Sequence, residues 1–98
     1  MAEIKWTEEA HRWLRDIYDY IAADNPEAAH KVVSGIYEKT QVLCNFPEIG
    51  QRYYVEAEGE IRILHYGHYR IAYLLRSSSM IDILSVFHGA LHINRYLP

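Results

Sequence analysis

The stretch RILHYGHYRIAYLL, residues 62–75, decides the fold of this chain. It belongs to two apolar runs, residues 61–66 and 69–75, which flank a short turn that contains glycine, and this is the pattern of a β-hairpin. A third run of the same kind, residues 80–87, follows three serines. The sequence therefore predicts three consecutive antiparallel strands.

Two arginines, Arg62 and Arg70, lie inside these otherwise apolar strands. A two-residue turn, Gly67–His68, would place them on opposite faces of the sheet, and a three-residue turn, residues 66–68, would place them on the same face. We favour the three-residue turn, because an arginine that points toward the core needs a buried partner. One shared cationic face is the resulting prediction.

The N-terminal half predicts a short strand, residues 2–6, followed by two helices, residues 8–23 and 26–44. Thr7 and Asn25 stand at N-cap positions, and each helix carries one apolar stripe at the spacing of a helical face. The two helices should form an antiparallel hairpin. A glycine inside the second helix, Gly35, would cost about 1 kcal/mol relative to alanine in an exposed helix, and a close approach of the two helices is one reason to tolerate it.

Residues 45–60 begin as a loop with proline and glycine and end in an acidic stretch, and residues 89–98 predict a short helix or a tail. The expected order is β-α-α-β-β-β in a single domain, residues 1–98. This is an α+β fold in which the helical hairpin packs on one face of a mainly antiparallel sheet. The other face is left for function.

The charge is distributed unevenly along the chain. The formal net charge is −3, which argues against a free-standing nucleic-acid binder. From residue 61 onward, however, the sequence contains four arginines and four histidines but one acidic residue, an aspartate. This part of the fold should serve an anionic or acidic partner.

The sequence also indicates where the protein works. Cys44 is the only cysteine, so no disulfide within the chain is expected. The chain shows no apolar run of signal-peptide or membrane-spanning length. A cytoplasmic protein without membrane contact is the expectation.

Three phrases carry a resemblance to a known family: FPEIG (residues 46–50), YRIAYLL (69–75) and IDILSVFHGALHINRYL (81–97). Together with the predicted order of elements, they resemble the RelE/ParE superfamily of toxins from bacterial type II toxin-antitoxin systems, plasmid stabilisation proteins among them. The resemblance covers nearly the whole chain. It implies a cytosolic toxin that a cognate antitoxin wraps and neutralises, as a dimer or a heterotetramer with that antitoxin.

The superfamily has two branches with different activities. ParE-like members inhibit DNA gyrase, and RelE-like members are metal-independent endonucleases that cut mRNA on the ribosome. The HGA phrase after the last strand is similar to the ParE-like branch, and the only lysines, Lys5, Lys31 and Lys39, lie outside the cationic part. The resemblance therefore implies a non-enzymatic inhibitor of DNA gyrase, with the endonuclease and an inactive toxin fold as alternatives.

The candidate site residues follow from the resemblance. Arg70 matches the strand arginine of the family, and with Arg62 and Arg95 it would contact the target or its phosphates. In a nuclease, Arg70 would stabilise the transition state while His88 or Tyr96 moves protons. An ion pair of Arg70 with a carboxylate such as Asp82 is the structural alternative.

A metal site is not predicted. His88 and His92 have the i, i+4 spacing of two ligands on a helix, but the pair straddles a strand end and a glycine, and no cysteine lies nearby. The prediction is that the protein uses no metal and no other cofactor.

Overall fold

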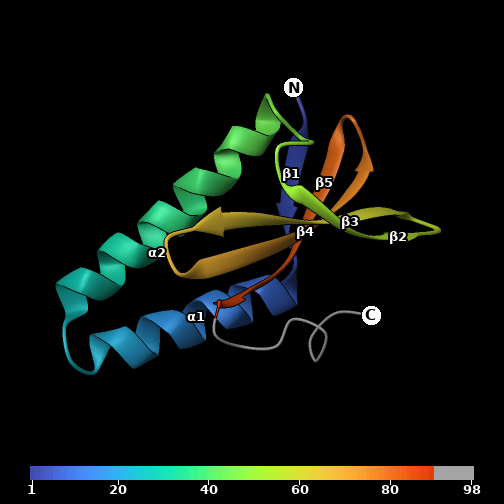
Figure 1. Cartoon of the computed structure of the whole chain (residues 1–98). Coiled ribbons are helices and arrows are strands. Elements are labelled where there is room, and N and C mark those ends of the chain that lie inside the picture. The colour runs from blue at the N-terminus through green and yellow to red at the C-terminus, as the bar shows by residue number, and fades with distance from the viewer. Residues whose placement is uncertain (90–98) are drawn as a thin grey trace.

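The computed structural model describes residues 1–89 (Figure 1). In chain order, the elements are β1 (Glu3–Trp6), α1 (Glu8–Ala22), α2 (Pro26–Gln41), the short 3₁₀ helix η1 (Val42–Cys44), β2 (Gln51–Glu56), β3 (Gly59–Tyr66), β4 (Tyr69–Ser77) and β5 (Met80–His88).

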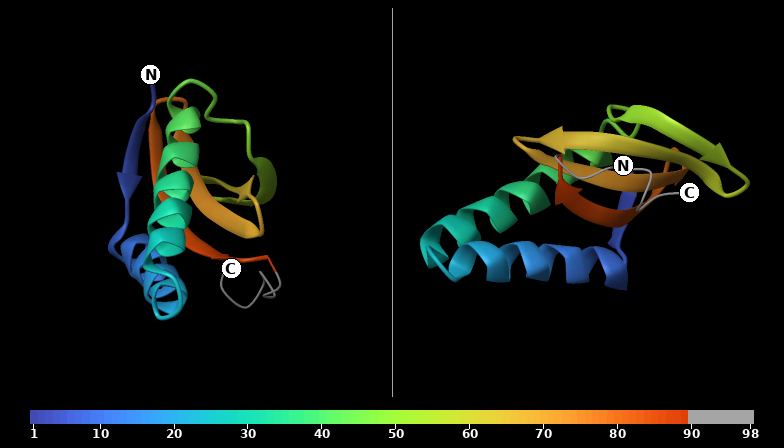
Figure 2. Two further views of the ribbon diagram at one scale, coloured as in Figure 1. Left: turned by 90° about the vertical axis from the view of Figure 1, so that its left-hand side faces the viewer. Right: turned by 60° about the horizontal axis from the view of Figure 1, so that its bottom comes forward.

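The strands form one sheet in the order β1-β5-β4-β3-β2. The edge strand β1 runs parallel to β5, and the other neighbours are antiparallel. Both helices lie on one side of the sheet (Figure 2). The predicted α+β class, with a helical hairpin on one face of a mainly antiparallel sheet, is confirmed.

The helices begin at the two predicted caps. The side chain of Thr7 accepts a hydrogen bond from the Ala10 N–H at 3.1 Å, and Asn25 Oδ1 accepts one from the Ala28 N–H at 3.1 Å. These bonds satisfy backbone donors that the first turn of a helix leaves free. The second helix ends three residues earlier than predicted, because residues 42–44 tighten into η1.

Strand β2 lies in the segment that the sequence predicted as a loop. Residues 51–55 are all exposed, so they show no alternation of apolar and polar side chains. The strand pairs with β3 and contains a bulge between Arg52 and Tyr54. Pairing with β3, rather than a pattern of its own, makes this segment a strand.

Each face of the sheet carries an apolar cluster. Along β4, Ile71 and Tyr73 point toward the helices and join a core built by Ile36, Leu43 and other buried residues. Ala72 and Leu74 alternate with them and belong to a smaller cluster on the opposite face, with Ile61, Ile63 and Phe87. We call this second side the open face; of α1, Trp13 packs against its cluster, with ring centroids 6.1 Å from Phe87.

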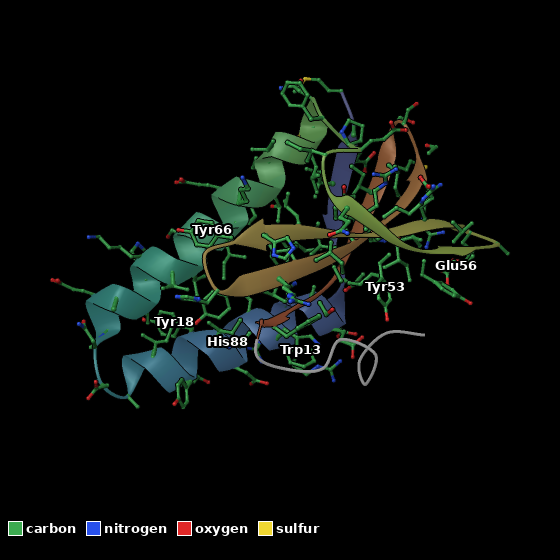
Figure 3. The ribbon with its side chains drawn as sticks, in the orientation of Figure 1. Trp13, Tyr18, Tyr53, Glu56, Tyr66 and His88 are labelled. Carbon is green, nitrogen blue, oxygen red and sulfur yellow. The ribbon has the colours of Figure 1, made fainter. Side chains whose placement is uncertain are left out.

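Gly35 is required by a strand rather than by the neighbouring helix. A Cβ at this position of α2 would collide with the ring and hydroxyl of Tyr66 at the end of β3. Figure 3 shows the Tyr66 side chain lying against α2. The sequence offered a close approach of α1 and α2 as one reason for this glycine; the nearest atoms to its missing Cβ belong instead to Tyr66.

Within residues 1–89, none of the helices has both the length and the apolar character needed to cross a membrane.

Candidate functional site

The turn between β3 and β4 has two residues, Gly67 and His68. Tyr66 pairs with Tyr69, and Gly67 has a φ of 57°, a conformation that glycine adopts readily in such turns. Arg62 therefore pairs with Tyr73 on the helix side, and Arg70 pairs with His65 on the open face. The prediction of a three-residue turn with both arginines on one face is wrong.

Arg62 is held by backbone carbonyls of the loop between η1 and β2. Its Nη1 donates to Glu48 O at 2.8 Å and to Gly50 O at 2.7 Å, and its Nη2 lies 3.3 Å from a carboxylate oxygen of Glu60. The partner that an inward-facing arginine needs thus comes from a segment at least twelve residues away in sequence. This is the physical reason why the prediction of a shared face fails.

Tyr73 binds the same loop from the neighbouring strand. Its hydroxyl accepts from the Gly50 N–H at 2.9 Å and donates to Pro47 O at 2.8 Å. Burial raises the pKa of the Tyr73 hydroxyl above its usual value, against the lowering effects of the Gly50 N–H and the Arg62 charge. Arg62 and Tyr73 together fix the FPEIG segment to the sheet.

Arg70 lies at the junction of two hollows on the sheet. One, of about 230 Å³, is lined by Gln51, Arg52, Tyr53, Ile63, His65 and Arg70. The other, of about 380 Å³, is lined by His65, Gly67, His68, Arg70, His88 and Gly89. His65 and Arg70 belong to both hollows. We call this pair of hollows the Arg70 surface, and Figure 3 shows Tyr53 and His88 near its two ends.

The structural alternative for Arg70, an ion pair with Asp82, is not formed. Asp82 instead accepts from Arg76 Nε at 2.7 Å, and Glu58 lies 3.3 Å from Arg76 Nη1. The hydrogen bond and charge of Asp82, aided by Glu58, raise the pKa of Arg76 against the lowering effect of burial. Among residues 1–89, Arg70 forms no ion pair with a carboxylate.

His88 lies where the Arg70 surface meets a second, apolar groove. Its ring stacks on His68 with a centroid distance of 6.0 Å, and the Tyr69 ring lies nearly perpendicular to it with a centroid distance of 5.6 Å. The groove, of about 510 Å³, runs between α1 and the ends of β4 and β5, and it is lined by Trp13, Asp16, Ile17, Tyr20, Tyr69, Val86, Phe87 and His88.

Three predicted site residues are thereby placed: Arg70 on the open face, His88 at its rim and Arg62 on the helix side. Arg95 and Tyr96, like His92, lie outside the described residues. In the part of the chain that the structure describes, no group of three or more histidine, cysteine, aspartate or glutamate side chains is arranged to hold a metal ion.

Comparison of the sequence with protein families gives a match over residues 4–91 to the family described as the ParE toxin of the type II toxin-antitoxin system parDE. A curated relative, the candidate toxin Y4kP of Sinorhizobium fredii, is 35% identical over 86 residues, which cover 88% of this chain and 86% of the relative.

Two solved structures are similar to the fold. The chromosomal ParDE toxin-antitoxin system from P. aeruginosa contains a chain with a TM-score of 0.71 and 28% identity, over 90% of this chain and 96% of that one. The RelBE2 toxin-antitoxin complex of Mycobacterium tuberculosis contains a chain with a TM-score of 0.60 and 22% identity, over 89% and 96%. The second likeness concerns the fold alone.

Proposed function

As a member of the ParE toxin family, the chain is the toxin component of a type II toxin-antitoxin system, and we propose that it inhibits DNA gyrase until its cognate antitoxin binds it. The match to the ParE family over residues 4–91 is the single observation that carries this proposal. The likeness to the ParDE system at 28% identity supports it. A gyrase inhibitor of this kind acts in the cytoplasm.

Arg70 is the residue through which we expect the toxin to contact its target. It is partly exposed, it lies on the face that the helices leave open, and its guanidinium has no carboxylate partner among residues 1–89. Arg62 instead stabilises the fold, because its guanidinium donates hydrogen bonds to two carbonyls of the FPEIG loop.

A supercoiling assay with purified gyrase and toxin freed of antitoxin tests the proposal. We expect micromolar toxin to inhibit supercoiling and equimolar antitoxin to restore it. Arg70→Gln should weaken inhibition by about tenfold or more, because a hydrogen bond to a charged group contributes about 1.5–3 kcal/mol. The matched control, Arg15→Gln, removes the same charge from an exposed position of α1 and should leave inhibition unchanged. Gyrase that stays fully active at micromolar excess of folded toxin would refute the proposal.

Cleavage of mRNA is the second candidate function, and the neighbourhood of Arg70 and His65 favours it. A guanidinium that stabilises a phosphorane and an imidazole that moves a proton can cleave RNA without a metal. Mapping transcript ends after induction decides between the two functions. Codon-phased cuts that vanish in Arg70→Ala would establish the nuclease, and intact messages would exclude it. Expression without growth arrest would instead indicate a fold that only binds its antitoxin.

A further inference from the structure

Three charged residues form a stripe on the exposed side of α1. Arg12, Asp16 and Asp19 recur at the four- and three-residue spacing of one helix face, and all three are exposed. This face lies opposite the one that carries Ala10 and Ile17 into the core. In the right-hand view of Figure 2, α1 lies at the bottom of the molecule, with the sheet and α2 above it. The stripe is therefore open to a binding partner.

The order of the charges in this stripe does not stabilise the single chain. None of the three residues forms an ion pair with any of residues 1–89. Asp19 lies in the last turn of α1, where the helix dipole favours a base over an acid. Arg12 and Asp16 also stand in the less favourable order of an i, i+4 pair, with the base first. The fold of one chain thus leaves this charge pattern unused.

The same pattern is complementary to a second copy of α1. When two α1 helices pack antiparallel around a twofold axis between positions 15 and 16, Arg12 of each copy lies opposite Asp19 of the other. The opposite charges then meet twice, because a twofold contact repeats each pair. At the axis itself, positions 15 and 16 of each copy carry one positive and one negative charge, so the charges balance there. Charge complementarity therefore favours a second copy of this chain as the binding partner.

Tyr20 and a neighbouring hollow fit the same arrangement. Tyr20 is 85% exposed and lies on the flank of α1 that also carries Trp13 along the apolar groove. On this flank, a hollow of about 230 Å³ is lined by Glu9, Arg12, Trp13 and Asp16. In the antiparallel pair, Tyr20 of one copy lies opposite the turn between Glu9 and Trp13 of the other. A large exposed ring thus meets a hollow that can receive it.

We propose that the toxin forms a symmetric homodimer through the exposed face of α1, in which Arg12 binds Asp19 of the second copy and Tyr20 occupies the hollow of the second copy. The contact of two helices is small, so the dimer should be weak and concentration-dependent. The ion pairs fix the antiparallel register, and the two tyrosines supply most of the affinity. This inference goes beyond gyrase inhibition and does not depend on it.

Sedimentation equilibrium of the full-length toxin, freed of antitoxin, tests the proposal. We expect a monomer–dimer equilibrium at toxin concentrations up to about 0.5 mM, because a small interface binds weakly. Arg12→Glu and Asp19→Arg should each weaken dimerisation at least about tenfold, because each substitution places like charges opposite each other twice. An equimolar mixture of the two variants should dimerise with about the wild-type Kd, because opposite charges then meet again at both contacts.

Further variants keep the test decisive. Lys31→Glu makes the same change of charge on an exposed position of α2 and should change the Kd less than about twofold. Tyr20→Ala should weaken dimerisation about tenfold or more, whereas Tyr54→Ala on β2 should not. Circular dichroism confirms that each variant is folded. The proposal fails if the folded wild type stays monomeric over the whole concentration range, if the mixture dimerises no better than the single variants, or if Lys31→Glu weakens dimerisation as much as Arg12→Glu.

Discussion

Arg62 and Arg70 are eight positions apart in one hairpin, yet they perform opposite tasks. Arg62 donates to two carbonyls of the FPEIG loop and is largely covered, with 14% of its side chain exposed. Arg70 stands on the other face beside His65. Because the turn has two residues rather than three, Arg62 lies on the helix side and stabilises the fold, whereas Arg70 lies on the open face and is available to a partner.

Tyr73 offers the cleanest test of the loop anchor. Tyr73→Phe keeps the buried ring but removes the hydroxyl that binds the Gly50 N–H and Pro47 O. The buried Gly50 N–H then loses its partner, so the free energy of unfolding should fall by about 1–3 kcal/mol. Urea unfolding followed by circular dichroism measures it.

Tyr37→Phe is the matched control, because the Tyr37 ring is 51% exposed and its hydroxyl can bond to water. This variant should change the free energy of unfolding by less than about 0.5 kcal/mol. Equal effects of the two substitutions would show that the Tyr73 hydroxyl does not anchor the loop.

At the scale of elements, α2 is fitted to the end of β3 at one residue. Glycine inside a helix normally costs about 1 kcal/mol relative to alanine. Here the Tyr66 ring occupies the space that a Cβ at Gly35 would fill. Glycine is tolerated in α2 because the missing Cβ lets the Tyr66 ring, at the end of β3, pack directly on the helix backbone.

Gly35→Ala should displace the end of the Tyr66 ring, and the cost of this shift should offset the roughly 1 kcal/mol by which alanine is the better helix former. Removal of the ring should remove this cost. In a Tyr66→Ala background, Gly35→Ala should be neutral or stabilising by up to about 1 kcal/mol.

A double-mutant cycle by urea unfolding measures this coupling between Gly35 and Tyr66. Additive effects of the two substitutions would contradict the contact.

At the scale of the whole molecule, Glu60 links pH to stability. Burial acts to raise the pKa of this carboxyl, but hydrogen bonds from Arg52 and Arg62 and their charges outweigh it, so the pKa lies below its ordinary value of 4.5. The folded protein binds its proton less readily than the unfolded chain does. The stabilisation that ionised Glu60 gives to the folded protein is therefore complete above pH 4.5 and is lost as the pH falls through the lowered pKa of Glu60.

Glu60→Gln should lower the free energy of unfolding at pH 7 and have a smaller effect at pH 3, because below pH 4.5 this carboxyl takes up a proton in the unfolded wild-type chain and part of the stabilisation is lost. Urea titrations of both proteins at the two pH values measure the difference. Glu56→Gln, on the neighbouring strand, serves as the control, because Glu56 forms no ion pair with residues 1–89. An equal effect of Glu60→Gln at pH 3 and pH 7 would refute this linkage.

Local patterns predicted most of the elements, because caps and apolar spacing act within a few residues. Thr7 and Asn25 mark the helix starts, and the three apolar runs mark β3, β4 and β5. Strand β2 was missed, because it is exposed and bulged and is ordered by its pairing with β3. Of the candidate site, the sequence indicated Arg70 and His88 but not the two hollows around them.

The sequence by itself determined the α+β order, the helical hairpin and the strands that carry the two arginines, since each follows from interactions between near neighbours in the chain. Only the tertiary structure decided which face each arginine occupies and what it binds. A shift of the strand register by one residue moves each side chain to the opposite face of the sheet. The carbonyl groups that bind Arg62 belong to Glu48 and Gly50, fourteen and twelve residues away in the sequence. Contacts at that separation form only when the sheet has closed on the loop.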